Sequence, residues 1–216
     1  MPMNEIDELL KRKLEDGREF RDMEMRAAED DGDDRVVEGY ATTFNDEYLL
    51  WSEPDYRVYE KVDRNAFDGC DMSDVIMQYD HEGRVFARMS NRTLTCNPDE
   101  RGLRIRAMLG GTEIGRELYQ EIKGGYTTKM SIGFTVKTQE RTEERDEDAG
   151  KTVVHRKITG VKKLYDVSAV SLPANDATEI SARNFGEGVI AEIEKERLAS
   201  LERKRKIQII KIMMEV

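Results

Sequence analysis

Apolar and polar side chains alternate along several short stretches of the chain, which is the pattern of half-buried β-strands. The stretches are RVVEGYATTF (35–44), VIMQY (75–79), RTLTC (92–96), GLRIRAML (102–109), KMSIGFTVKT (129–138), TVVHRKITGV (152–161) and KLYDVSAVSL (163–172). The internal segment TEIGRELYQEIKGG (112–125) instead repeats apolar residues at every fourth position, with an N-capping residue at Thr112 and two glycines at its end, so it predicts an α-helix. We therefore predict a β-rich α+β domain of mostly antiparallel strands with a few surrounding helices.

The two ends of the chain differ from this domain in composition. Residues 1–34 contain 13 Asp and Glu against 6 Lys and Arg and end in AAEDDGDD, which predicts a short helix followed by a flexible acidic leader. Residues 184–216 contain good helix formers with recurring apolar pairs, which predicts an amphipathic helical tail. The folded domain is then expected at 35–183. Inside it, the charged segment QERTEERDEDAGK (139–151) predicts a solvated hairpin connection.

Charge and cysteine content exclude several classes of function. The 216 residues carry a formal net charge of −10, so the chain as a whole should be repelled by nucleic acid and by anionic membranes, and neither is expected as a partner. Cys70 and Cys96 have no metal-site spacing and are too few for a disulfide framework, so we expect reduced thiols. The N-terminus lacks the apolar core of a signal peptide, and no stretch is long and apolar enough to span a bilayer. We expect a soluble protein without a recognisable export signal.

Two polar residues stand out as candidates for chemistry. Ser131 lies in the stretch TTKMSIGF, where Met130, Ile132 and Phe134 indicate a buried strand. His81 follows the predicted strand VIMQY, at a point where a strand can deliver a side chain to a cleft. Each residue also has an ordinary structural explanation, the serine as a strand residue and the histidine as a solvated loop residue. Taken singly, neither residue indicates an activity.

A set of sequence words occurs in an order that is typical of one protein family. The words are GYATTFN, YDH followed by ARMSNRTL, DERGLRIRAML, GRELYQEIKGG, KMSIGF and LYDVSAVSLPAN, all between residues 35 and 183. In this order they resemble the serine proteases of tailed-bacteriophage proheads, which mature the capsid and are related to the herpesvirus assemblins. The individual words are short, and the ordered set carries the resemblance.

The resemblance implies an assemblin-like, barrel-like fold and a catalytic triad that needs no cofactor. On this chain it assigns Ser131 as the nucleophile, His81 as the base and Asp166 as the third member. A serine hydroxyl is a poor nucleophile at neutral pH and needs an imidazole to accept its proton, and a third group must orient that imidazole. A rigid strand holds the hydroxyl in place. Gly133 is expected to leave space for a substrate backbone, or else to mark a bulge.

The chain departs from the family pattern at several positions. The third member is usually Glu, so Asp166, which is shorter by one methylene, requires a backbone closer to His81. Assemblins use a second histidine as third member, which leaves His155 as the alternative, although Asp166 matches the closer family. Arg88 follows Ala87, where relatives often carry glycine. This arginine is a candidate for supporting an oxyanion site, and a surface ion pair is its ordinary explanation.

The resemblance also implies a location and a set of partners. The expected substrates are the major capsid protein or its scaffolding segment, and the chain itself, inside the phage prohead in the host bacterial cytoplasm. The helical tail suits self-association, so a noncatalytic capsid-assembly scaffold component that retains the fold is the alternative function. A metal hydrolase built on His81, His155 and carboxylates is a weaker hypothesis, because the histidines form no local ligand pair such as HExxH.

Overall fold

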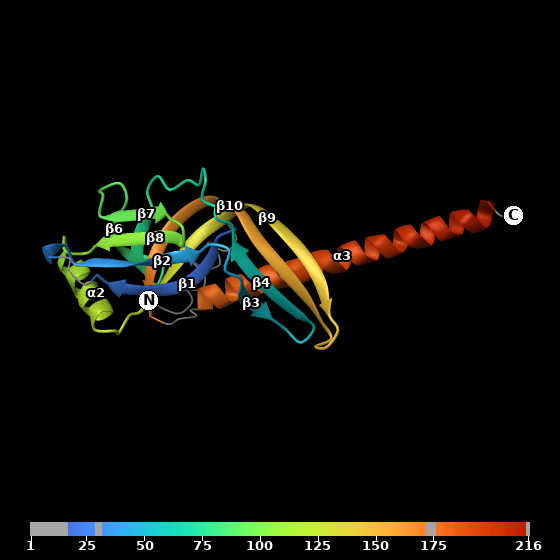
Figure 1. The fold of residues 1–216 in the computed structure, drawn as a ribbon, viewed down its shortest axis with the longest axis horizontal. Helices are drawn as coiled ribbons and strands as arrows, with labels where there is room; N and C mark the ends of the chain where they lie inside the picture. The colour runs from blue at the N-terminus through green and yellow to red at the C-terminus, as the bar shows by residue number, and fades with distance from the viewer. Residues whose placement is uncertain (1–16, 29–31, 172–175, 215–216) are drawn as a thin grey trace. The chain divides into compact units, whose positions relative to one another are not determined.

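The computed structural model describes residues 17–28, 32–171 and 176–214 and is rich in β-strands (Figure 1). Its strands are β1 (Glu19–Ala27), β2 (Val36–Thr43), β3 (Tyr48–Ser52), β4 (Tyr56–Val62), β5 (Ile76–Tyr79), β6 (Glu82–Arg88), β7 (Leu94–Pro98), β8 (Gly102–Met108), β9 (Lys129–Asp146) and β10 (Lys151–Val170). Its helices are the short 3-10 helix η1 (Gly32–Asp34), α2 (Glu113–Lys123) and α3 (Asp176–Met214). None of the helices in the described ranges has the length and apolar character needed to cross a membrane. The chain divides into two compact units, Met1–Ala182 and Arg183–Val216.

The strands form one mixed sheet with open edges. The order is β3-β4-β10-β9-β1-β2-β8-β7, with β5 and β6 attached beside β10. Most neighbours are antiparallel, but β4 and β5 run parallel to β10. Among the described strands, β3 and β7 do not pair with each other, because they extend the sheet from opposite sides of the β9–β10 pair. The strand-rich α+β fold class is therefore confirmed, whereas the barrel implied by the resemblance is not formed, since the sheet does not close.

The strand β10 connects the two halves of this sheet. Its first half pairs with β4, its second half pairs with β5, and β9 lies along its other side (Figure 1). The sequence predicted two strands here, at 152–161 and 163–172. The structure forms a single strand, because register shifts on both sides of Gly160 absorb the irregularity without ending the ladder.

The charged segment 139–151 is mostly strand, so the predicted hairpin connection is wrong for most of its length. β9 continues to Asp146, and the chain reverses within 147–150, where Gly150 has a φ of 66°. Side chains on this part of β9 are mainly exposed. Backbone hydrogen bonds to β10 hold the strand without apolar burial, so the charge pattern predicted the exposure correctly but not the conformation.

A strand also forms inside the predicted acidic leader. β1 lies between β9 and β2 and pairs with the part of β9 that carries Ser131. Phe20 and Arg21 are buried, so the interpretation as flexible leader is wrong for this strand. A two-residue period was present in the sequence, where Met23 and Met25 alternate with charged residues, but the acidic surroundings obscured it.

Four charged residues, which we call the ionic cluster, fasten β1 to β4 and β10, and all of them are buried except Glu19, which is half-buried. They are Glu19, Arg21, Glu60 and Arg156. Arg21 donates two hydrogen bonds to Glu60, of 2.5 and 2.8 Å, and Arg156 Nη1 donates to Glu60 Oε2 and to Glu19 Oε2, both at 2.6 Å. Burial raises the pKa of Glu60, but the charges of Arg21 and Arg156 outweigh it, so this pKa lies below its ordinary value. Two positive and two negative groups therefore balance inside the sheet.

The helix at 112–125 forms as the sequence predicted. Thr112 caps α2, accepting a 3.1 Å hydrogen bond from Gly115 N, and the helix ends at Gly124. Gly125 follows with a φ of 75°, a left-handed backbone that favours glycine. α3 begins at Asp176, earlier than the predicted tail. The short helix predicted at the start of the leader lies outside the described residues.

Candidate active site

His81 lies in the two-residue turn that joins β5 to β6. Tyr79 pairs with Glu82, and between them Asp80 and His81 have φ values of 47° and 60°. These values are those of a type I′ hairpin turn, in which asparagine and glycine are the favoured residues. A histidine with this backbone stores strain, which is a frequent property of functional sites. Asp80 N donates to Ala169 O at 2.8 Å and thereby fastens the turn to β10.

The imidazole of His81 is held by Asp166 on β10. His81 Nδ1 lies 2.5 Å from Asp166 Oδ1, a hydrogen bond in which a protonated Nδ1 donates. The parallel pairing of β5 with β10 produces this contact, because it places Asp166 opposite Ile76 at the start of the strand that leads into the turn. Ser168 Oγ donates a second hydrogen bond, of 2.8 Å, to the same carboxylate oxygen. The carboxylate of Asp166 is thus fixed on one side by Ser168 and orients the His81 ring on the other.

Ser131 lies on the same face of the sheet, on β9. It is opposite Ser168 of β10, and Gly133, two residues further along β9, is opposite Asp166. Residues two apart on a strand share a face, and so do residues opposite one another on neighbouring strands. The Ser131 hydroxyl therefore projects from the side of the sheet on which His81 and Asp166 meet.

Gly133 makes room for the carboxylate of Asp166. A Cβ at this position would lie 2.5 Å from Asp166 Oδ2 and 3.2 Å from Phe20 Cε1, so any side chain would displace the acid. Phe20, on β1, packs edge-on against the His81 ring with the ring centroids 4.5 Å apart. The space that the sequence assigned to a substrate backbone is therefore filled by Asp166 and Phe20.

All three candidate residues are buried. Ser131 is 0% exposed, and His81 and Asp166 are each 4% exposed. Within the described part of the chain, the structure forms no hydrogen bond to Ser131 Oγ. A buried hydroxyl without a partner costs on the order of 1–3 kcal/mol, and such groups call for a functional explanation. The site thus combines a formed His–Asp pair with a serine hydroxyl that is not committed to another bond.

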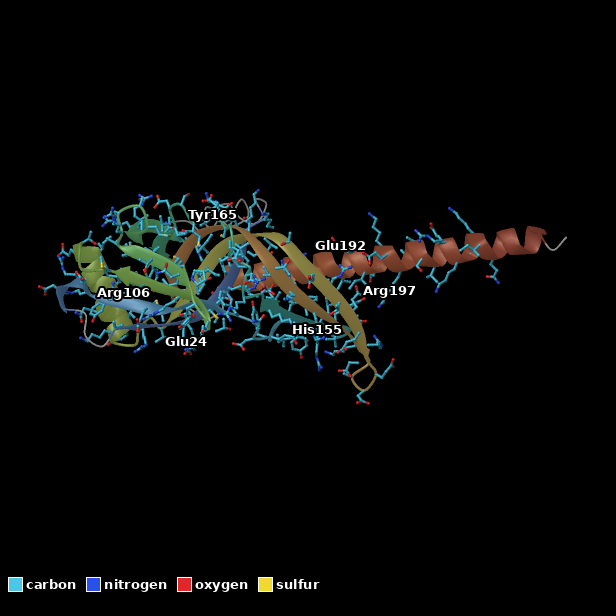
Figure 2. The ribbon with its side chains drawn as sticks, turned by 45° about the horizontal axis from the view of Figure 1, so that its top comes forward. Glu24, Arg106, His155, Tyr165, Glu192 and Arg197 are labelled. Atoms are coloured by element: carbon cyan, nitrogen blue, oxygen red, sulfur yellow. The ribbon has the colours of Figure 1, made fainter. Side chains whose placement is uncertain are left out.

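The alternative third member, His155, lies elsewhere. Its Nδ1 is 2.9 Å from Glu47 Oε1, and its ring stacks on Tyr59 with the centroids 5.7 Å apart. At about 3.3 Å per residue, roughly 36 Å of strand separates His155 from Asp166. Figure 2 shows His155 and Tyr165, the neighbour of Asp166, at separate places along β10. The structure therefore brings Asp166 to His81 and leaves His155 outside the site.

The structure also bears on two other sequence predictions, the role of Arg88 and the metal-hydrolase hypothesis. Arg88 forms an ion pair with Asp74, including a hydrogen bond of 3.3 Å from Nε to Oδ1, and its side chain is 43% exposed. This is the surface ion pair that the sequence offered as the ordinary explanation. Within the described ranges, no three His, Cys, Asp or Glu side chains lie together in a group that could hold a metal ion.

A comparison with protein families places the chain in a known class. A model of the caudovirus prohead serine protease family matches residues 21–189. The chain belongs to this family. The resemblance carried by the ordered words is thereby confirmed. No curated protein and no solved structure matches the chain, so the relation to herpesvirus assemblins stays a prediction.

Two residues of this prohead protease site were not anticipated from the sequence. The motif Asp-Val-Ser at 166–168 places Ser168 on the same face as Asp166, because side chains alternate along a strand, and this signal could have indicated its role. The contact of Phe20 with His81 had no comparable signal, because it depends on the pairing of β1 with β9, more than a hundred residues away in sequence. The family match begins at residue 21, within β1, which agrees with the place of this strand in the sheet.

Proposed function

We propose that this prohead protease hydrolyses peptide bonds with Ser131 as nucleophile, His81 as general base and Asp166 as the residue that orients His81. The observation that supports this most is the buried 2.5 Å hydrogen bond between His81 and Asp166 on the face that carries Ser131. Burying such a pair costs desolvation, and among the described residues Ser131 Oγ, on the same face, has no hydrogen-bond partner, which favours a catalytic over a packing role.

The proposed chemistry has the steps of a serine protease. Ser131 Oγ attacks the carbonyl carbon of the scissile bond while His81 Nε2 takes the hydroxyl proton. The tetrahedral adduct collapses when His81 gives that proton to the leaving amine nitrogen, which departs and leaves an ester on Ser131. A water molecule then attacks the ester, its proton again passes to His81, and Oγ is released as a hydroxyl. Asp166 keeps Nδ1 protonated and stabilises the charged imidazole in both halves.

Two further features shape this reaction. Ser168 is a positioning residue, because its 2.8 Å hydrogen bond fixes the oxygen of Asp166 that faces His81. The complete burial of Ser131 means that neighbouring groups must move before a peptide carbonyl can reach it. A closed resting site of this kind would restrain the protease until a substrate segment opens it.

The substrates of the proposed reaction are capsid-assembly proteins inside the prohead, in the cytoplasm of the host bacterium. The major capsid protein or its scaffolding segment supplies the scissile bonds, and the chain also cleaves itself. β1 limits this self-processing, because a cut after residue 27 would remove the strand that carries Phe20. At the N-terminal end, cleavage that preserves activity is therefore expected before Gly17, and the second expected place is the start of the tail, at residues 184–188.

The test is co-expression of the chain with its capsid protein, followed by identification of new termini by mass spectrometry. Wild type should generate new termini that are absent with Ser131→Ala. Ser90→Ala removes an exposed serine outside the site and serves as the matched control, which should cleave like wild type. Cleavage at the same positions by a folded Ser131→Ala protein would refute the assignment of the nucleophile.

The noncatalytic alternative has one observation in its favour. On α3, Leu198 and Leu201 are 63% and 62% exposed, and Ile207 is 50% exposed, so this helix carries apolar side chains that self-association would bury. We propose that α3 supports assembly alongside proteolysis. If the chain were only a scaffold, neither the unmutated protein nor Ser131→Ala would generate new termini, and Ser131→Ala would assemble as well as the unmutated protein.

A further inference from the structure

A groove lies beside the candidate nucleophile, where two strands separate. β1 pairs with β9 over residues 19–24 and with β2 over residues 25–27. Gly39 permits this crossing, since a Cβ there would lie 2.6 Å from Glu24 O. Beyond the crossing, residues of β1, β2 and β8 and Lys129 of β9 line a cavity of about 620 Å³. This volume lies within the range of ligand-binding clefts.

The groove adjoins the site through Asp22. This residue lines the groove and is also the partner of Ser131 across the β1–β9 ladder. Side chains opposite each other in such a ladder have Cβ atoms about 5 Å apart. Once the groups that cover Ser131 have moved, a peptide with its scissile bond at Ser131 can continue over Asp22 into the groove. Figure 2 labels Glu24, which lies two residues beyond Asp22 on the same face of β1.

The charges along the groove indicate what it binds. Its lining includes the cations Arg26, Arg101, Arg104 and Lys129 and the carboxylates Asp22, Glu24 and Glu38. Glu38 accepts hydrogen bonds from Arg26 at 2.8 Å and from Arg104 at 3.0 Å, and Glu24 accepts one from Lys129 at 3.0 Å. Among the described residues, Arg101 forms no ion pair, and its guanidinium lies 4.6 Å from the centre of the Tyr40 ring. The lining thus carries four cations against three carboxylates, and Arg101 is the cation at the end away from Ser131.

We infer that this groove binds the extended substrate and that Arg101 selects an acidic side chain at a distance from the scissile bond. The sheet order β9-β1-β2-β8 places three strand spacings between Ser131 and the start of β8. At about 4.8 Å per spacing this is roughly 14 Å, which an extended peptide covers in about four residues. The selected Asp or Glu thus lies about four residues from the cleaved bond. This inference rests on the proposed function.

Binding can be measured apart from cleavage. Two fluorescein-labelled decapeptides, identical except for a Glu-Glu pair in one and a Lys-Lys pair in the other, are titrated into Ser131→Ala protein and followed by anisotropy. The acidic peptide should bind more tightly, and Arg101→Glu in the same background should weaken it by at least about tenfold. Arg64→Glu makes the same charge change on an exposed loop outside the groove and should leave binding unchanged. Equal binding of both peptides, or no binding of either, would overturn the inference.

Cleavage supplies the second readout. A peptide library prepared from a bacterial proteome is digested with wild type, Arg101→Glu and Ser131→Ala proteins, and the new termini are sequenced by mass spectrometry. Sites cut only when Ser131 is present should be enriched in Asp or Glu about four residues to one side, and Arg101→Glu should lose that enrichment. If cleavage depends on Ser131 but the sites show no enrichment in Asp or Glu, only the role of Arg101 is contradicted and the proposed function stands. Cleavage that persists unchanged in Ser131→Ala contradicts the proposed function, while the peptide titration still decides whether the groove binds acidic segments.

Discussion

The ionic cluster should make the position of β1 unusually sensitive to the loss of one arginine. Replacing Arg21 by methionine retains most of the side-chain volume and removes the group that donates two hydrogen bonds to Glu60. Glu60 is 0% exposed, so water cannot replace the lost partner. The cluster would then hold two carboxylates against the single guanidinium of Arg156. We expect Arg21→Met to destabilise the sheet through this uncompensated charge.

The size of the effect follows from burial. Removing one partner of a buried ion pair typically costs about 3–5 kcal/mol of unfolding free energy, whereas an exposed pair is worth about 0–1 kcal/mol. Arg26 is the matched control, because it lies on the same strand and pairs with Glu38 but its side chain is 64% exposed. Arg26→Met should therefore cost about 1 kcal/mol or less.

Urea denaturation followed by the fluorescence of Trp51 measures this difference. Trp51 is the single tryptophan and lies on β3, in the same sheet as β1. The double variant Arg21→Met with Glu60→Met should be more stable than Arg21→Met alone by at least about 1 kcal/mol, because it removes the buried charge as well. Equal stability of Arg21→Met and Arg26→Met, or simple additivity of Arg21→Met and Glu60→Met, would refute the reasoning.

The same cluster predicts a dependence on pH. Burial raises the pKa of Glu60, but the charges of Arg21 and Arg156 lower it by more, so it lies below the ordinary value of 4.5 in the folded protein. A carboxylate with a lowered pKa contributes stability that is present above its ordinary pKa and is lost as the pH falls below it. Wild type should therefore lose more unfolding free energy than Arg21→Met between about pH 5 and pH 3. An equal loss of unfolding free energy in both proteins would show that Arg21 does not cause the pH dependence.

Three further predictions concern the active site. Asp166→Asn should lower the cleavage rate by about 10³–10⁴-fold, and His155→Ala should lower it by less than about twofold, with initial rates measured by mass spectrometry. The opposite order would make His155 the third catalytic residue. Ser168→Ala should lower the cleavage rate by about tenfold and shift the pH–rate profile, and Ser168→Thr should restore both. An unchanged profile would show that Ser168 does not position Asp166. Removal of residues 1–16 should preserve Ser131-dependent cleavage, whereas removal of residues 1–27 should abolish it, and an active product of the longer deletion would contradict the need for β1.

The sequence by itself determined the helix α2 and supplied the candidate residues of the site. The helix α2 follows from apolar residues at every fourth position and from the capping of Gly115 N by Thr112, both of which are local interactions. Ser131, His81 and Asp166 were named through the resemblance of ordered words to a known family, and the structure places Ser131 on the face of the sheet where His81 and Asp166 meet. Their catalytic roles stay a proposal.

Tertiary structure decided what depends on pairing between distant segments. β1 is too acidic to be recognised as a strand, and it forms one because β9 and β2 satisfy its backbone and because Arg21 finds Glu60. The charged half of β9 is a strand because β10 supplies its hydrogen bonds. The role of Gly133 likewise appears only when β10 places Asp166 opposite it. Hydrophobic periodicity reports burial along one segment, whereas these features arise from hydrogen bonds and charges between segments, which no local pattern encodes.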